Sequence, residues 1–414
     1  MTSPRPARTW FALLLMVIAT LGGCASIGGD PLARPAPPVQ PAVAYLHHLR
    51  AGVARAREQM PQMIRSADVA ARRVVRNRGR IFVGGSQPDF PVELLTGAGR
   101  LAMLRPVPER IDLIEKDDVI LYAARGPLTG NDRLRIDRWR TERGAYVVAF
   151  ASARQSDVRY FPPDALIDCG AESGVTLAGG KLVPSDSVLN LLNAWAWTGE
   201  FFSACTRLGA TPVMHAGEDV PSSAARARWY AGSAFHPDLN VAPVGTGVVG
   251  MAYLDRIEQS LSAILDESPD ALRFAGVWFR DATPVWSSAQ IISRLHPDHF
   301  RDPRAPQPFE RIADAGAPAP DVAQASLVLA RRAAPHLAVA AAHMRRSKLV
   351  YTSVDRAGDD RAGHILYLDP HCPAEDACVR VAGYDVPILA SGSVVQAAIY
   401  WAIVAEIYPP PPAE

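Results

Sequence analysis

The sequence predicts an α/β protein built around a parallel sheet, and three patterns in its 414 residues predict it. Short, continuously apolar segments such as 118–123 and 145–151 are typical of strands that are buried on both faces. Longer segments between them, of which 42–77 is the first, repeat apolar residues at helical spacing. Two long apolar segments, 186–208 and 394–407, are expected to form helices that close two halves of the chain. Strands and helices that alternate in this way favour a parallel sheet with helices on both faces.

The first half supplies its elements in a regular order. The helix expected over 42–77 leads to a short strand at 81–83, which the pair Gly84-Gly85 ends. The elements expected after it are a helix running into a strand at 91–104, strands at 118–123, 145–151 and 165–168, a helix at 186–208 and a strand at 211–214.

The second half repeats part of this pattern. Tyr45-Leu46 begins the first helix, and Tyr253-Leu254 begins a comparable helix later in the chain. We therefore predict two α/β units in tandem, whereas two unrelated amphipathic helices would be the simpler interpretation. The predicted organisation is a signal peptide at 1–23, a proline-rich tether at 24–42, a first unit at 43–220, a linker at 221–250, a second unit at 251–408 and a proline-rich tail at 409–414.

The N-terminus has the features of an export signal. Arg5 and Arg8 precede the apolar run Trp10–Leu21, which is shorter than the roughly 20 residues of a membrane-spanning helix. The segment Leu21-Gly22-Gly23-Cys24 resembles the lipobox of bacterial lipoproteins, which implies cleavage before Cys24 and attachment of lipid, palmitate included, to that cysteine. We therefore expect a protein anchored by lipid on the periplasmic side of a membrane. An ordinary signal peptide followed by an incidental cysteine is the alternative.

The composition excludes some partners. The 43 basic and 42 acidic residues nearly cancel, so nothing indicates nucleic-acid binding. Four cysteines follow Cys24, and an oxidising compartment would permit two disulfides among them. Cys372 and Cys378 flank a short loop and are one candidate pair, whereas Cys169 and Cys205 are equally compatible with separate buried thiols. No spacing matches a zinc site, and we expect no metal and no cofactor.

The turns after the first two strands carry the residues of a family resemblance. They read Gly84-Gly85-Ser86-Gln87-Pro88 and Ala124-Arg125-Gly126-Pro127-Leu128-Thr129. With the order of the elements, they resemble the sugar isomerase (SIS) domain family, whose members bind phosphosugars at such turns and at a helix start. The resemblance implies a phosphorylated or anionic sugar ligand, bound by Gly84, Gly85, Ser86, Gln87, Arg125 and Thr129.

The same resemblance implies a catalytic pair, Glu200 on the closing helix and His215 after the next strand, which would move a proton in aldose–ketose exchange. Two departures from the family pattern leave catalysis open. Pro88 interrupts the first turn, and the second turn lacks the serines of the family. The alternative function is a non-catalytic envelope lipoprotein that presents a surface to a partner protein.

Other motifs are given structural interpretations. Gly245–Gly250 matches G-x-G-x-x-G, but Pro243 interrupts the strand that a dinucleotide site needs before it. The segment His296–His299 is either part of a metal site or a polar turn. No G-x-S-x-G motif exists, so a serine hydrolase lacks its nucleophile. The remaining interpretations are a polar loop or sugar-binding rim at Asp355, Asp359, Asp360, His364 and His371, and core packing for Trp195, Trp197 and Trp401.

Overall fold

A computed structural model of the protein describes residues 40–153, 162–170, 174–177, 182–217, 220–280, 285–290, 305, 311–313, 325–330, 348–352 and 365–408. All of them belong to one compact unit, Gln40–Glu414. The predicted signal peptide, Cys24, the segment His296–His299 and the proline-rich tail lie outside the described residues. So do Asp355, Asp359, Asp360 and His364.

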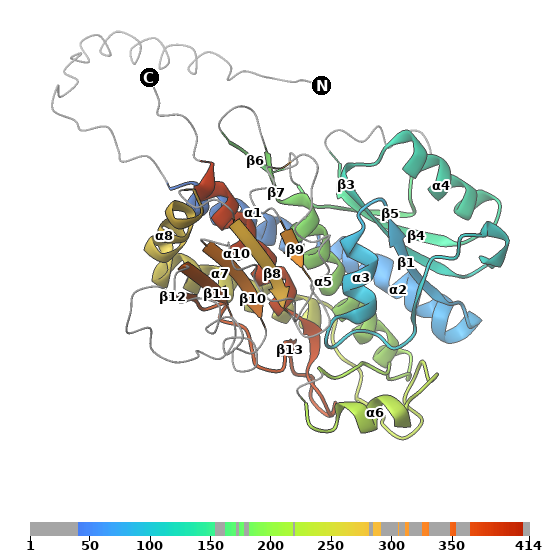
Figure 1. The fold of residues 1–414 in the computed structure, drawn as a ribbon. Helices are drawn as coiled ribbons and strands as arrows, with labels where there is room; N and C mark the ends of the chain where they lie inside the picture. The colour runs from blue at the N-terminus through green and yellow to red at the C-terminus, as the bar shows by residue number, and fades with distance from the viewer. Residues whose placement is uncertain are drawn as a thin grey trace, which may run out of the picture. The chain divides into compact units, whose positions relative to one another are not determined.

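The first half forms a five-stranded sheet in which every neighbouring pair is parallel, with the order β2-β1-β3-β4-β5 (Figure 1). This confirms the predicted fold class. The predicted strand at 165–168 has the observed bounds, and the others differ by a few residues. The bounds are β1 Ile81–Gly85, β2 Leu104–Pro106, β3 Val119–Pro127, β4 Tyr146–Ser152 and β5 Ala165–Asp168.

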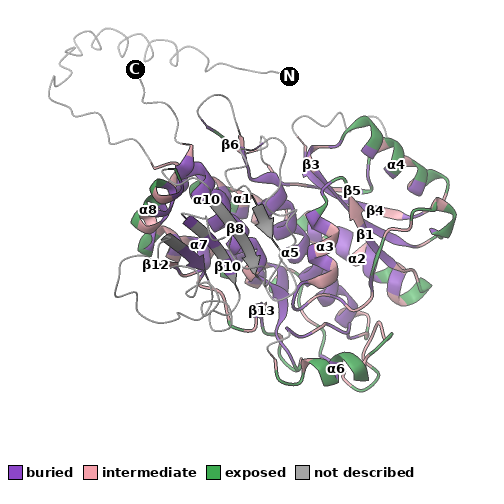
Figure 2. Cartoon of the chain, viewed as in Figure 1, coloured by how far each residue is buried: buried purple, intermediate pink, exposed green. Residues whose placement is uncertain are grey.

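Helices cover both faces of this sheet. One face packs against α4 (Gly130–Thr141) through a small apolar cluster that includes Tyr122, Ile136 and Trp139. The other face belongs to the main core and contacts three helices (Figure 2). These are α2 (Met60–Asn77), α3 (Asp89–Thr96) and α5 (Asp186–Arg207). The strands are therefore buried on both sides, which explains their continuous apolar sequences.

The second half contains another parallel sheet whose strands are connected in the same order, β9-β8-β10-β11-β12. In both sheets the second strand lies at one edge beside the first strand, and the remaining strands follow in chain order on the other side. The bounds are β8 Val285–Gln290, β9 Arg311–Ala313, β10 Ala325–Ala330, β11 Lys348–Thr352 and β12 Ile365–Leu368.

The similarity extends to the end of each half, where an antiparallel strand pair precedes the closing helix. The closing helices, α5 and α10 (Gly392–Ile407), place related residues at equivalent positions. These pairs are Asn190 and Gln396, Trp195 and Trp401, and Glu200 and Glu406. The strand pairs are β6 (Gly174–Thr176) with β7 (Leu182–Pro184), and β13 (Ala377–Val379) with β14 (Ile388–Ala390).

Each closing helix packs against the opening helix of the other half. α5 contacts α7 (Val248–Glu267), and α10 contacts α1 (Pro41–Glu58) and α8 (Pro269–Arg280). The carboxylate of Glu200 accepts hydrogen bonds from the backbone N–H groups of Gly247 and Gly250 at the start of α7, at 2.8 and 2.9 Å. The carboxylate of Glu406 accepts one from Ala42 at the start of α1, at 2.9 Å. These bonds satisfy amides that a helix start leaves without partners.

Three segments differ from the expectations. The helix predicted over 42–77 is divided at Gln59, because Pro61 lacks an N–H and can only stand in the first turn of a helix. The strand predicted at 211–214 was wrong, since only isolated bridges, at Pro212 and Met214, occur there. The segment 221–250 contains a short helix, α6 (Ser223–Trp229).

Two further features concern cysteines and membranes. Cys169, Cys205, Cys372 and Cys378 form no disulfide with one another, so the candidate Cys372–Cys378 disulfide is not formed. Burial raises the pKa of the Cys378 thiol to about 12. Within the described residues, no helix has both the length and the apolar character needed to cross a bilayer.

Candidate functional site

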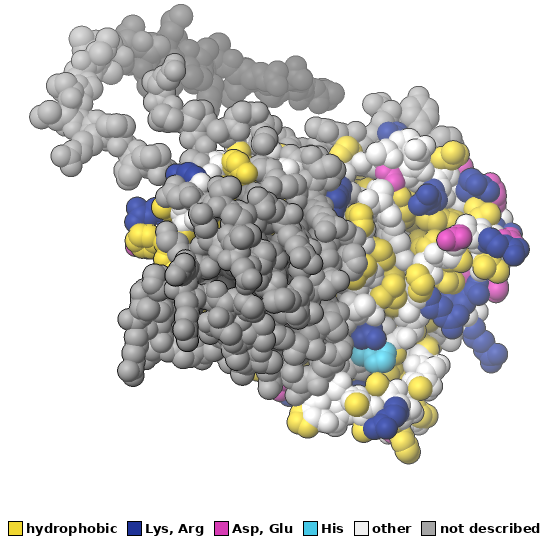
Figure 3. Space-filling model, in the orientation of Figure 1, with side chains coloured by type: hydrophobic (Ala, Val, Ile, Leu, Met, Phe, Trp, Pro, Cys, Tyr) yellow, Lys and Arg dark blue, Asp and Glu magenta, His cyan; other side chains and the backbone are white. Residues whose placement is uncertain are grey.

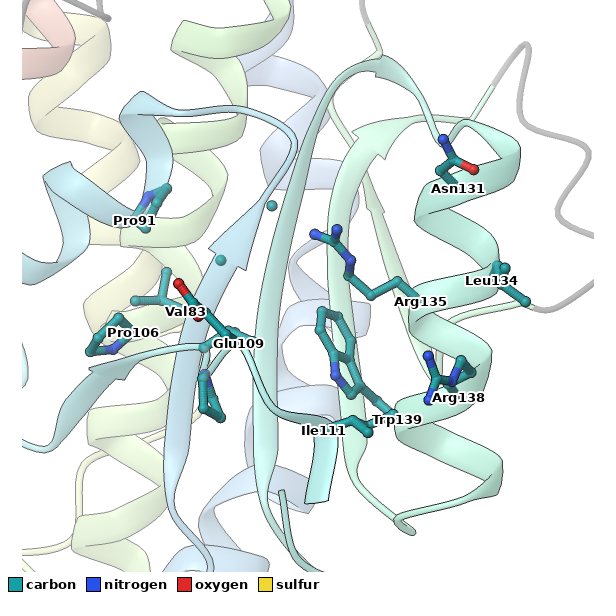
Figure 4. A pocket seen from close by; sticks show the side chains of 14 residues that line it. Val83, Pro91, Pro106, Glu109, Ile111, Asn131, Leu134, Arg135, Arg138 and Trp139 are labelled. Atoms are coloured by element: carbon teal, nitrogen blue, oxygen red, sulfur yellow. The ribbon is translucent and has the colours of Figure 1, made fainter. Parts of the chain in front are cut away.

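A cavity of about 720 Å³ opens at the carboxyl ends of β1 and β3. This is where the strand order reverses direction in the first sheet, and open α/β sheets bind ligands outside the strand ends at such a point. The cavity lies on the α4 face, between β1, the segment 106–111 and one side of α4 (Figure 4). In the surface view, hydrophobic side chains gather beside Lys and Arg side chains over the part of the molecule that contains β1 and α4 (Figure 3).

Gly84 and Gly85 line this cavity, as the sequence predicted for a ligand site. Both belong to the end of β1 and pair with β3. Gly85 has φ +152°, and a Cβ there would lie 2.0 Å from the carbonyl oxygen of Ala123, whereas a Cβ on Gly84 would press on Val107. The glycines are therefore required for close backbone packing, and their lack of side chains leaves this wall of the cavity open.

The start of α4, where the resemblance placed an anion, is occupied by a carboxylate of the chain itself. Thr129 caps the helix, and its hydroxyl and N–H both donate to Asp132, at 2.6 and 2.8 Å. The Tyr122 hydroxyl also donates to Asp132, and Ser86 lies against the same carboxylate. Burial opposes ionisation of Asp132, but the hydrogen bonds from Thr129 and Tyr122 outweigh it and lower the pKa of the carboxyl. Thr129 thus binds the carboxylate of Asp132, an anion of the protein itself.

Gln87 points to the opposite face of the sheet from the cavity. Its side chain is fully buried and donates to Asp89 at 3.0 Å and to the carbonyl of Ser187 at 3.2 Å. Asn190 of α5 donates to the Gln87 side-chain oxygen and to the carbonyl of Ala124, both at 2.9 Å. This network joins the turn after β1 to the closing helix. Gln87 therefore does not line the cavity.

Arg125, the cation that the sequence proposed for the ligand, is paired within the protein. Its guanidinium lies 3.3 Å from the carboxylate of Asp89, whose side chain is 1% exposed. The pair lies on the same side as Gln87 and Asn190. Because Asp89 already balances the charge of Arg125, this arginine is suited to holding the turns together.

Two cations, Arg135 and Arg138, line the cavity. Arg135 is the one without a partner among the described residues. It projects from α4 toward the glycines at the end of β1 (Figure 4). No hydrogen bond or ion pair joins its guanidinium to any residue that the structure describes. Arg138, one turn later, is bound to Glu142 at 3.0 Å. Trp139 closes the base of the cavity and packs edge-on against Tyr122.

The sequence reasoning missed α4 and therefore Arg135. The helix carries an almost entirely polar sequence, so it lacks the broad apolar stripe from which helices are predicted. Two signals were available. Thr129 and Asp132 have the spacing of a capping box, and Ile136 and Trp139 follow at helical spacing.

Glu200 and His215 are not brought to this cavity. Glu200 is fully buried and lies about 15 Å along α5 from Asn190, where it binds the start of α7. Burial raises its pKa, and the two backbone donors oppose the rise. His215 is half-buried, and its backbone pairs with Gly99 and Arg100 in the segment before β2. Neither lines the cavity.

The remaining motifs have structural places. Trp195, Trp197 and Trp401 are fully buried, which confirms their assignment to the core. Gly247 of the G-x-G-x-x-G segment is the residue before α7. The described residues contain no cluster of histidine, cysteine, aspartate or glutamate side chains suited to a metal ion.

Comparison with known proteins supports the fold. No family model and no curated protein matches the sequence. A Salmonella typhimurium LT2 protein assigned to sugar binding is similar at TM-score 0.50 and 11% identity, over 88% of this chain and 100% of that one. Weaker similarity is found to the C-terminal domain of glucosamine-fructose-6-phosphate aminotransferase from Francisella tularensis (TM-score 0.44, 10% identity, 86% and 95% covered). A Clostridium novyi NT protein assigned as a tagatose-6-phosphate ketose/aldose isomerase gives TM-score 0.37 and 9% identity, with 88% and 91% covered.

The similarity to the Salmonella protein has a limited meaning. At this level of identity it shows a shared α/β fold over most of the chain, in agreement with the order of the strands. It does not show a ligand, because one fold supports many functions.

Proposed function

We propose that the protein binds a phosphorylated or otherwise anionic sugar derivative in the cavity between β1 and α4. The observation that carries the proposal is Arg135, which points into a cavity at the strand ends and whose guanidinium has no partner among the described residues. Guanidinium groups form strong, often bidentate hydrogen bonds with phosphate and carboxylate. The sugar component is supported by the fold shared with a protein assigned to sugar binding.

Binding without isomerisation is the activity we propose. Glu109 is the only carboxylate that lines the cavity among the described residues, and no described histidine lines it. A pair of proton-transferring side chains is therefore not assembled here. Incubation with glucose 6-phosphate or fructose 6-phosphate should leave the aldose and ketose unchanged, as NMR spectroscopy of the mixture will show. Interconversion by the purified protein would contradict this part of the proposal.

Isothermal titration with glucose 6-phosphate, and with glucose as the neutral comparison, tests the binding proposal. We expect binding of the phosphate and at least ten-fold weaker binding of glucose. Arg135→Gln should weaken binding of the phosphate by about 10- to 100-fold, since a hydrogen bond to a charged group contributes about 1.5–3 kcal/mol.

Arg110→Gln is the matched control for that experiment. Arg110 is an exposed arginine beside the cavity that does not line it and pairs with Asp112. Its replacement should change the affinity by less than two-fold. Equal losses in the two variants would show that only general positive charge matters, and unchanged affinity in Arg135→Gln would overturn the proposed site.

We also propose that the protein is exported and anchored through lipid on Cys24. The support is the sequence of residues 1–24 alone, with its basic start, short apolar run and lipobox-like end. Cells supplied with labelled palmitate should label the protein, and Cys24→Ser should remove the label, whereas Ser26→Ala should keep it. Label that persists in Cys24→Ser would overturn the proposal.

A further inference from the structure

The walls of the cavity differ in chemistry from what a bare sugar phosphate needs. We infer that the ligand carries an apolar substituent as well as its negative group, an inference that rests on the proposed function. The apolar side is formed by Val107 and Ile111 from the segment after β2 and by Leu134 from α4. Pro91, Pro106 and Pro108 extend it. These side chains offer no hydrogen bonds.

The polar side chains of the cavity lie mainly on the α4 side. The polar side chains that line the cavity are those of Glu109, Asn131, Arg135 and Arg138, and Arg138 is bound to Glu142. A hexose phosphate carries hydroxyl groups around its whole ring, and the apolar side of the cavity offers these hydroxyls no hydrogen-bonding side chain. A ligand with one polar side and one apolar side can form hydrogen bonds with the α4 side and apolar contacts with the opposite side. A uniformly polar ligand matches only the α4 side.

Leu134 is a specific indication of such a ligand. It is 56% exposed on a helix whose other apolar side chains, Ile136 and Trp139, face the sheet. Leu134 therefore adds nothing to the core of the described unit, yet it lines the cavity one position before Arg135. In Figure 4 the two side chains leave neighbouring positions of α4, Arg135 toward the sheet and Leu134 away from it, so Leu134 lies at the outer rim of the cavity. A substituent that extends from an anion at Arg135 toward the outer rim of the cavity would contact Leu134.

The size of the cavity agrees with this inference. A volume of about 720 Å³ lies in the upper part of the range of roughly 300–1,000 Å³ that small-molecule pockets occupy. The cavity thus has room for a substituent in addition to a sugar ring and its anionic group.

A series of ligands with one anion and one ring tests the inference. We would titrate glucosamine 6-phosphate, N-acetylglucosamine 6-phosphate and N-hexanoylglucosamine 6-phosphate into the whole protein. Each buried methylene should tighten binding about four-fold, so the hexanoyl derivative should bind at least ten-fold more tightly than the acetyl derivative. Leu134→Ser should remove most of that gain and leave the affinity for glucosamine 6-phosphate within about two-fold.

Leu113→Ser is the matched control, because Leu113 is also an exposed leucine, at 49%, but does not line the cavity. It should preserve the full preference for the hexanoyl derivative. Equal affinity for all three ligands, or an equal loss of preference in both leucine variants, would overturn the inference while the proposed sugar-phosphate site stands. Absence of binding by all three ligands would instead overturn the proposed function.

Discussion

The two faces of the first sheet differ in how polar and charged side chains are paired at the ends of β1 and β3. On the α5 face, Gln87, Asp89, Arg125 and Asn190 are buried or half-buried and bind one another. On the α4 face, Arg135 projects into a cavity and pairs with no residue in the part of the chain that the structure describes. The comparison teaches that an arginine near a strand end indicates a ligand only when its charge is not already balanced.

The largest expected effect is a loss of stability on removal of the cation on the α5 face. Arg125→Gln leaves the buried Asp89 carboxylate without its countercharge, so we expect a loss of about 3–5 kcal/mol in the free energy of unfolding. Urea unfolding measures this loss. Glucose 6-phosphate should still bind below the unfolding transition, and weakened binding by a folded variant would contradict the division between the faces.

Removal of the amide on the same face should have a smaller effect. Asn190→Ala leaves the Gln87 side-chain oxygen and the Ala124 carbonyl without their donor, and we expect a loss of about 2 kcal/mol. The midpoint of urea unfolding reports it. A loss below 0.5 kcal/mol would mean that water replaces the Asn190 amide. The hydrogen bonds of Asn190 would then not stabilise the turn after β1.

The hydroxyl of Thr129 at the cap of α4 should contribute about 1 kcal/mol to the free energy of unfolding, and this contribution should depend on pH. Thr129→Ala removes the hydroxyl donor to Asp132 and keeps the backbone donor. The pKa of Asp132 in the folded protein lies below its ordinary value of 3.8. A lowered carboxyl pKa stabilises the protein above pH 3.8, and this stabilisation is lost as the pH falls through the folded pKa. The difference between wild type and Thr129→Ala should therefore shrink below pH 3.8. Urea unfolding between pH 2.5 and 6 measures it, and a constant difference would contradict the assignment.

Ser86→Ala should have the smallest effect. The exposed hydroxyl lies against Asp132, which already accepts bonds from Thr129 and Tyr122. We expect the free energy of unfolding to fall by less than 0.5 kcal/mol. The affinity for glucose 6-phosphate should change by less than two-fold. A ten-fold loss of affinity would return Ser86 to the ligand site that the sequence predicted.

The sequence predicted the elements better than their contacts. Continuous apolar segments indicated β1, β3, β4 and β5 because both faces of these strands are buried. The polar helix α4 was missed because it rests on the sheet by few apolar side chains. Gly84 and Gly85 line the cavity, and their part in binding a ligand stays a prediction. The pairing of Arg125 with Asp89 could not be predicted, since it depends on how two turns distant in the sequence meet. The pairing of Thr129 with Asp132 is local, and the spacing of the two residues in the sequence was the signal for it.

The reciprocal bonds of Glu200 and Glu406 have a consequence for assembly. Each half of the chain supplies the acceptor that completes a helix start in the other half. A gene fragment encoding one half would therefore yield a polypeptide with an uncovered helix terminus and an apolar closing helix without its neighbour. Two copies of one such half would satisfy each other only as a symmetric dimer. The single chain thus has the internal arrangement of a fused dimer.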